Sequence, residues 1–229
     1  MLFKCFSHLL HTFSFIVSLS LFSFLFVPKV IEASPMTTTF INEIHYDNTG
    51  VDSGEYVEIV SNSNIVLTDW SLLLYNGNNG ALYDSFEFDT WSYISTHAQF
   101  DFYTIKTVGI QNGSPDGLVL SDGTDIVQFL SYEGVFTATS GIAKDFTSND
   151  IGVSELSSTS VGLSLQLSGV GSDYSDFVWE APQLSTFGLA NIGQEFTIPN
   201  KSVFSVNEPS SFILFFLFII LIMSKYRFY

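Results

Sequence analysis

The middle of this chain is a series of short apolar runs separated by clusters of Gly, Asn, Asp and Ser, and this pattern limits the folds that it can adopt. Apolar and polar residues alternate over residues 37–46, as in a strand with one buried face. The Asp122-Gly123 pair lies between two apolar runs, which is typical of a β-hairpin. No sustained helical period appears outside the two ends of the chain. The pattern therefore predicts an all-β fold, a β-sandwich of about seven or more short strands. The predicted strands are residues 37–46, 56–60, 66–75, 118–120, 126–132, 161–167 and 177–179.

The first 33 residues have the layout of an export signal. Lys4 supplies a positive start, residues 13–27 are mostly apolar, and Ala33 precedes the expected cut before Ser34. The apolar run is shorter than the ~20 residues that a membrane span needs, which favours cleavage over an uncleaved transmembrane helix. We therefore predict a signal peptide over residues 1–33 and an exported mature protein.

The C-terminal end combines an acidic-Pro-Ser motif, the apolar run 212–223 and a basic tail. The polar residues that frame the run are Glu208, Pro209, Ser210, Lys225 and Arg227. This layout resembles the PEP-CTERM sorting signal, although Asn207 stands where that family has its first Pro. The resemblance implies a hydrophobic membrane helix over residues 206–229 that a sorting transpeptidase cuts; a plain tail anchor is the alternative. Residues 197–205 are predicted to be a spacer, and the protein is expected at the cell surface or outside the cell, anchored at least transiently in the membrane.

The part between these ends, residues 34–196, is long enough for one domain with a sizeable core. The only cysteine of the chain is Cys5, so this domain is expected to fold without disulfides. The whole chain has 23 acidic and seven basic residues, which gives a net charge of −16. Such a charge repels nucleic acid, so no nucleic-acid partner is expected, and it suits divalent cations.

Three segments near the start of the domain form a recognisable set: residues 40–48 (FINEIHYDN), 54–59 (GEYVEI) and 67–72 (LTDWSL). Together they resemble the opening of a bacterial lamin tail domain, and the resemblance extends over residues 39–196. It implies an immunoglobulin-like β-sandwich and an exported binding or scaffold module. Bacterial members often occur beside nucleases, phosphatases or adhesive modules, but the resemblance assigns no catalytic residue.

The residues give little support for catalysis. Beyond residue 33 the histidines are His45 and His97, and no zinc-ligand spacing or strand–turn–helix nucleophile motif accompanies them. His45 is expected to be a surface or hydrogen-bonded edge histidine of the first strand. Glu55 and Glu58, three positions apart, are expected on opposite faces of a strand. We therefore predict that the protein is not an enzyme and has no resident cofactor, calcium apart.

The best candidate for a site is the connection 47–55, which carries oxygen ligands and two glycines. Its candidate calcium ligands are Asp47, Asn48, Asp52 and Glu55. An ordinary turn closed by Asp, Asn and Gly is the alternative. Asp122 and Asp125 are expected to serve only the hairpin turn.

Aromatic residues are the other surplus of this chain. Trp70 lies in an apolar context and is expected in the core. Residues 86–93 alternate aromatic and polar side chains, so this segment is predicted to be a strand with Trp91 on one face. That face either binds sugar or belongs to an ordinary strand.

Three functions remain open from the sequence. The first is a surface-anchored, non-catalytic binding or matrix module for an extracellular polymer or protein. The second is a calcium-stabilised adhesive module, and the third is an accessory module to a separately encoded extracellular hydrolase. Fold class alone does not separate them.

Overall fold

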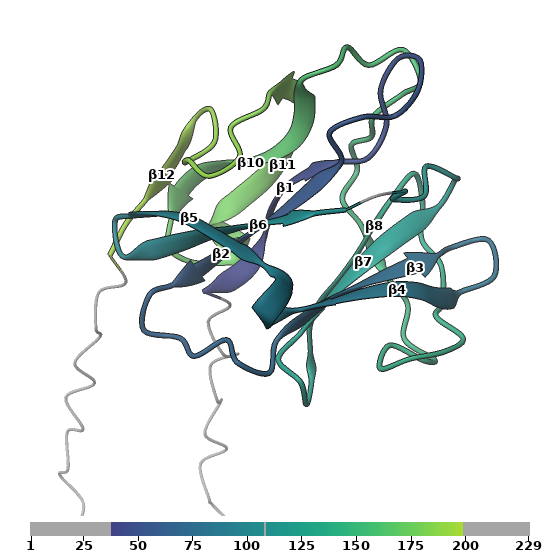
Figure 1. Ribbon diagram of the computed structural model, residues 1–229, viewed down its shortest axis with the longest axis horizontal. Coiled ribbons are helices and arrows are strands. Elements are labelled where there is room, and N and C mark those ends of the chain that lie inside the picture. Colours follow the sequence, from purple (N-terminus) through teal and green to yellow (C-terminus); the bar gives the residue numbers. More distant parts are fainter. Residues whose placement is uncertain (1–37, 108, 199–229) are drawn as a thin grey trace, which may run out of the picture. The chain divides into compact units, whose positions relative to one another are not determined.

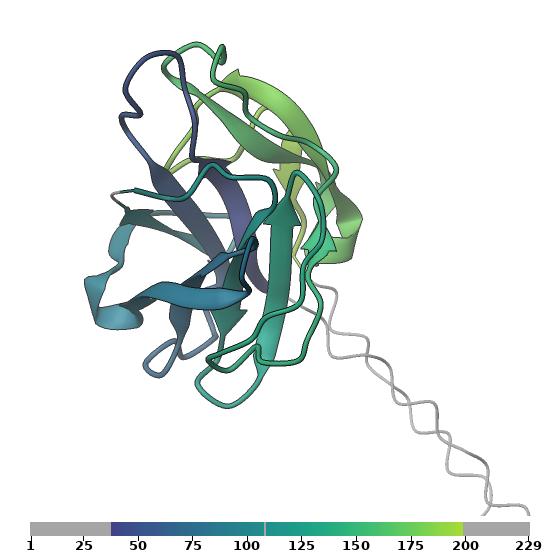
Figure 2. The ribbon, with the colours of Figure 1, turned by 90° about the vertical axis from the view of Figure 1, so that its right-hand side faces the viewer.

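The computed structural model describes residues 38–107 and 109–198, which fold into two β-sheets (Figure 1 and, turned, Figure 2). The predicted signal peptide (1–33), most of the predicted spacer and the predicted sorting segment (206–229) lie outside the described residues. The same holds for Glu208, Pro209, Ser210, Lys225 and Arg227. Within the described residues, no helix has the length and apolar character that crossing a membrane requires.

The larger sheet has seven strands in the order β11-β10-β1-β2-β6-β5, with β12 paired in parallel to β10. Its strands are β1 (Thr39–His45), β2 (Tyr56–Asn62), β5 (Ser92–His97), β6 (Phe100–Lys106), β10 (Leu163–Gly171), β11 (Phe177–Leu184) and β12 (Gln194–Phe196). The smaller sheet has five strands in the order β4-β3-β7-β8-β9. They are β3 (Ser71–Asn76), β4 (Ala81–Glu87), β7 (Asp116–Ser121), β8 (Ile126–Tyr132) and β9 (Asn149–Asp150). Two short 3-10 turns, η1 (Phe88–Thr90) and η2 (Tyr174–Asp176), precede β5 and β11.

The main core lies between the two sheets. Ile41 and Ile59 of the larger sheet belong to the same buried cluster as Leu72, Leu118 and Leu130 of the smaller one. Side chains from both inner faces therefore fill one apolar layer, which makes the fold a sandwich of two sheets. The predicted all-β, two-sheet architecture is confirmed.

The larger sheet also buries part of its outer face, so every residue of β1 is buried. Phe40 and Val60, next to the core residues Ile41 and Ile59, belong to a second apolar cluster because neighbouring strand residues point to opposite faces. Phe196 of β12 completes this cluster, with its ring 4.7 Å from that of Phe100. The last described strand thus covers the first.

Most predicted strands are present, and the Asp122 turn is confirmed. The Asp122 carboxylate accepts hydrogen bonds from the backbone N–H groups of Thr124 and Asp125, as a turn-forming Asp does. The predicted strand 66–75 begins later, at Ser71.

The prediction for residues 86–93 is wrong. The turn η1 divides this segment, and Trp91 is buried rather than presented outward. Its indole N–H donates to the carbonyl of Phe86, and its ring packs edge-on against Phe88. Phe86, Phe88 and Trp91 contribute to the main core cluster, whereas Tyr93 stays exposed, and a period-2 pattern does not reveal this division. Trp70, expected in the core, is partly buried and packs against the main cluster.

Candidate functional site

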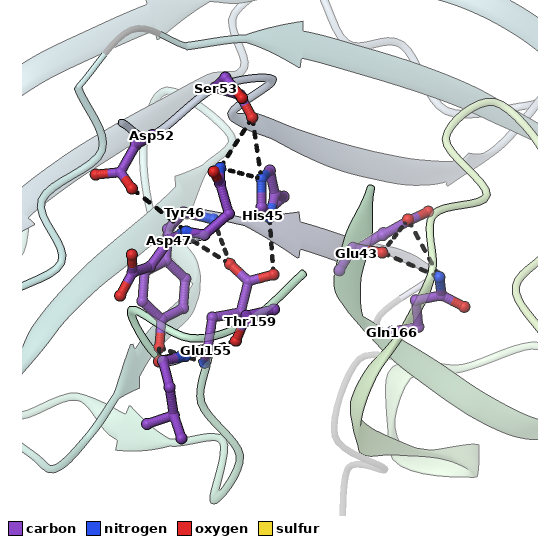
Figure 3. A network of polar contacts seen from close by, with 12 residues as sticks. Glu43, His45, Tyr46, Asp47, Asp52, Ser53, Glu155, Thr159 and Gln166 are labelled. Carbon is purple, nitrogen blue, oxygen red and sulfur yellow. Dashed lines mark hydrogen bonds and ion pairs between the residues drawn. The ribbon is translucent and has the colours of Figure 1, made fainter. Parts of the chain in front are cut away.

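The end of β1 and the connection that follows it are fixed by one buried carboxylate. Glu155 accepts a hydrogen bond from Nδ1 of His45 at 2.8 Å, and its other oxygen accepts from the backbone N–H groups of Tyr46 and Asp47 (Figure 3). Glu155 is fully buried, and the segment that carries it is tied to the β1–β2 connection by the Thr49 N–H, which donates to the Thr159 carbonyl. Two connections far apart in sequence therefore form one rigid unit.

Tyr46 closes this unit from the other side. Its hydroxyl accepts from the Glu155 backbone N–H at 2.8 Å and donates to the Glu133 carboxylate at 3.0 Å. Its ring stacks on Tyr132 of β8, with ring centroids 3.8 Å apart. The stack links the end of β1 to the smaller sheet.

His45 is buried and hydrogen-bonded to Glu155, so its expected place on the surface or at a sheet edge is wrong. β1 lies between β10 and β2 and has no free edge, whereas the expectation that the imidazole is hydrogen-bonded is correct. Burial lowers the pKa of His45, but the hydrogen bond and negative charge of Glu155 outweigh it, and the net shift is upward. The far ring nitrogen faces the Ser53 carbonyl and the Asn48 side-chain amide, both at 3.2 Å.

A pocket of about 250 Å³ opens beside His45. Its walls include Tyr56 and Phe187, whose ring centroids are 5.3 Å apart, and the hydroxyl residues Ser53 and Ser185. Leu163 and its neighbours complete the apolar part. The pocket therefore combines flat rings with a few polar groups, one of them held in place by Glu155.

The structure brings three of the four candidate calcium ligands together. The Asn48 N–H donates to the Asp52 carboxylate. Burial, and then the charge of Asp52, raise the pKa of Asp47. The Asn48 side-chain oxygen is buried and accepts no hydrogen bond from the described residues. Glu55 is held elsewhere, because its carboxylate accepts from the Gly109 N–H. Over residues 38–107 and 109–198, no three His, Cys, Asp or Glu side chains form a group that could hold a metal ion.

A second polar network was not predicted from the sequence. Glu43 of β1 and Glu58 of β2 are fully buried on the face of the larger sheet opposite the main core. Residues 185–193, called the strap here, cover them: Thr186 donates to Glu43 through both its N–H and its hydroxyl, and the Gly188 N–H donates to Glu58. Asn42 donates its amide to the other oxygen of Glu58 at 2.8 Å.

Burial raises the pKa of both carboxyl groups, and the charge of Glu43 raises that of Glu58 further. Burial, and then the charge of Glu43, raise the pKa of Glu58 to about 8, against partial opposition from the Asn42 and Gly188 hydrogen bonds. Burial also raises the pKa of Glu43, although hydrogen bonds from Ser164 and Thr186 oppose it. No His, Lys or Arg contributes to either shift. At neutral pH this arrangement favours a neutral Glu58.

Glu55 and Glu58, expected on one strand, therefore lie in two different parts of the structure. Glu55 precedes β2 and binds the connection at Gly109, whereas Glu58 lies within β2 under the strap. Trp91, considered for sugar binding, does not line the pocket beside His45.

Comparison of the chain with family models, with curated proteins and with solved structures gives no match. The function proposed below therefore depends on the sequence and on the contacts of this structure.

Proposed function

We propose that the chain is an exported, surface-anchored binding module without catalytic activity, and that its sandwich is immunoglobulin-like, of the lamin tail type. The two-sheet fold supports this reading. The segments that resemble a lamin tail domain include residues of the buried polar network. Asn42 and Glu43 bind the strap, and Glu58 lies beneath it. Export and anchoring rest on the sequence of residues 1–33 and 206–229.

The observation that carries binding is the pocket beside His45. Its volume of about 250 Å³ is below the ~300–1,000 Å³ of sites for drug-sized ligands, so it suits a single ring. Aromatic rings beside hydroxyl groups suit a sugar, whose apolar face stacks while its hydroxyls hydrogen-bond. We propose that the ligand is a sugar unit of an extracellular polysaccharide.

Replacing Tyr56 with Ala is expected to weaken sugar binding about tenfold, the effect of losing about 1.4 kcal/mol of ring contact. Saturation-transfer NMR with a panel of monosaccharides measures this. Tyr93→Ala is the matched control, because Tyr93 lies on β5 outside the pocket. Absence of transfer from the wild-type protein to every sugar, or an equal loss in both variants, would contradict the proposed ligand.

Calcium in the 47–55 connection is a second candidate, favoured by two observations. The carboxyl groups of Asp47 and Asp52 interact, and no Lys or Arg contributes to the shift at Asp47. The buried oxygen of Asn48 also lacks a partner among the described residues. A bound cation would offset the charges of the two carboxyl groups and coordinate the Asn48 oxygen.

Millimolar calcium is expected to raise the melting temperature by several degrees over EDTA, because a ligand that binds only the folded state stabilises it. Asp52→Ala is expected to abolish the rise. Asp150→Ala, an exposed acidic residue of β9, is the control and should keep it. An unchanged melting curve in the wild-type protein would make the connection an ordinary turn.

A further inference from the structure

The strap joins the buried carboxyl pair to the pocket that is proposed above to bind a sugar. Phe187 forms part of the pocket wall, and it lies between the two strap residues that hold the acids. The Thr186 N–H donates to Glu43 at 2.9 Å, and the Gly188 N–H donates to Glu58. The backbone on each side of Phe187 is therefore fixed by one of the two buried carboxyl groups.

The two strands under the strap place the acids and the pocket side by side. In the register of β1 and β2, Glu43 lies opposite Glu58. Two positions further along, His45 lies opposite Tyr56, and both line the pocket. Residues two apart on a strand point to the same face, so both pairs lie on the face that the strap covers. The ring of Phe187 lies 5.3 Å from that of Tyr56, centroid to centroid, so one segment covers the acids and closes the pocket.

We propose that Glu43 and Glu58 are positioning residues for the pocket: by binding the strap they hold Phe187 against Tyr56, and the pocket has its binding form only while the strap is closed, that is, bound to both acids. A proton on the acid pair lets the strap close, because two ionised carboxylates side by side would need water around them. The link between strap and pocket depends only on these contacts, whereas its effect on a ligand rests on the sugar binding proposed above.

Glu43 is the charged group that acts on Glu58. Around Glu58, β1 also supplies the neutral Asn42, β6 places Thr104 opposite it, and the strap sequence STFGLANIG contains no ionisable residue. Lys106, further along the same face of β6, is exposed and does not contribute to the shift. Burial, and then the charge of Glu43, raise the pKa of Glu58 to about 8, so the closed strap holds a proton that a hydrated Glu58 releases above its ordinary pKa of 4.5. Closing is therefore fully favoured below pH 4.5 and is weakened as the pH rises through about 8.

A fluorine label on the ring at position 187 tests the link without any ligand. Fluorophenylalanine in place of Phe187, in the full-length protein in detergent, reports by fluorine NMR on the contact of this ring with Tyr56. The signal is expected to move between pH 6 and pH 9 in the wild-type background and to stay in place in Glu58→Gln. His45 titrates in both proteins, so their difference isolates Glu58. Glu195→Gln, an exposed residue of β12, is the control and should behave as the wild type. A signal that does not move in the wild-type background, or that moves equally in Glu58→Gln, overturns the proposal.

Sugar binding at the same two pH values measures the consequence for a ligand. The affinity of the wild-type protein is expected to fall about tenfold from pH 6 to pH 9, within the limit of ~100-fold that two pH units of titration allow. The affinity of Glu58→Gln should not change. An affinity that is independent of pH while the fluorine signal moves overturns the positioning role. Absence of binding to every sugar at both pH values contradicts the proposed ligand alone, and the fluorine measurement then decides whether the acids position Phe187.

Gly188→Ala displaces the strap without changing any ionisable group. Gly188 has a φ of +89°, and a Cβ atom there would lie 2.4 Å from Cγ2 of Ile94 on β5. The variant is expected to give the alkaline fluorine signal already at pH 6 and to bind sugar weakly there. Gly152→Ala is the matched control, because Gly152 has a φ of +76° but its Cβ position has open space around it. Equal effects of the two variants, or an unmoved signal in Gly188→Ala, would contradict the link. The comparison with Glu58→Gln decides the question where Gly188→Ala does not fold.

Discussion

Glu58→Gln is expected to make the protein more stable at pH 9 than the wild type and to flatten the dependence of its unfolding free energy on pH. In the folded protein the pKa of Glu58 is raised to about 8, from the ordinary value of 4.5 in the unfolded chain. Between these values the folded state holds a proton that the unfolded state has released. Stability is therefore fully present below pH 4.5 and is lost as pH rises through about 8.

The size of this loss follows from the same linkage. Each pH unit within the window costs up to about 1.4 kcal/mol for one proton. Glutamine keeps an oxygen that can accept from the Gly188 N–H, but it carries no titrating group and no charge toward Glu43. The strap is therefore expected to stay bound at alkaline pH in the variant and to loosen in the wild type.

Chemical denaturation at pH 5, 7 and 9 measures this effect. Glu87→Gln, the same change at an exposed residue of β4, is the control and should leave the wild-type dependence intact. Hydrogen exchange of the Thr186 and Gly188 amides reports on the strap itself. Parallel pH curves for wild type and Glu58→Gln would show that Glu58 does not carry the dependence.

Glu155→Ala is expected to destabilise the protein by about 3–5 kcal/mol, the usual cost of removing one partner of a buried charged pair. The change leaves Nδ1 of His45 and the N–H groups of Tyr46 and Asp47 without their acceptor. Each is a buried donor, and an unsatisfied buried donor costs about 1–3 kcal/mol.

The control for this change is Glu133→Ala, which removes the other carboxylate that binds Tyr46 but leaves the His45 pair intact. Its expected cost is about 1 kcal/mol, that of one hydrogen bond. NMR titration of His45 in Glu155→Gln separates charge from packing: the pKa of His45 should fall, because Glu155 is what raises it. Equal costs for the two alanine variants, or an unmoved titration, would contradict the role given to Glu155.

The two-sheet sandwich could be predicted from the sequence, because most of its strands and turns show in the pattern of neighbouring residues. The strand β1 and the turn at Asp122 depend only on neighbouring residues, and both were predicted correctly. The single buried face expected of β1 was wrong, because every residue of the strand is buried. The strands β4, β5, β6, β9 and β12 were not predicted. The turn η1 interrupts the pattern between β4 and β5, and β9 and β12 are too short to show a period, whereas the alternation of β6 was visible and was missed. The strand that covers the second core cluster, β12, is three residues long.

The candidate site was harder to predict, because its partners are distant in sequence. A strand that reads Asn-Glu-Ile-His suggests polar side chains facing solvent, as alternation normally implies. In the structure those side chains are covered by the strap and by the segment around Glu155, each more than a hundred residues away. No local pattern contains that information. The acids at Asp47 and Asp52 were recognisable, since they lie within one short connection.

The partners of β1 also set the order in which the protein can form. Thr186 is 143 residues beyond Glu43, and Gln194, which donates to the Asn42 side chain, is 152 residues beyond Asn42. The strand synthesised first is thus completed by nearly the last part of the domain. A nascent chain released before residue 186 would leave the carboxyl groups of Glu43 and Glu58 uncovered, and one released before residue 194 would lack β12, which covers the second apolar cluster. We expect such a chain to remain unfolded, and the complete one to fold slowly and all at once, as contacts between distant segments require.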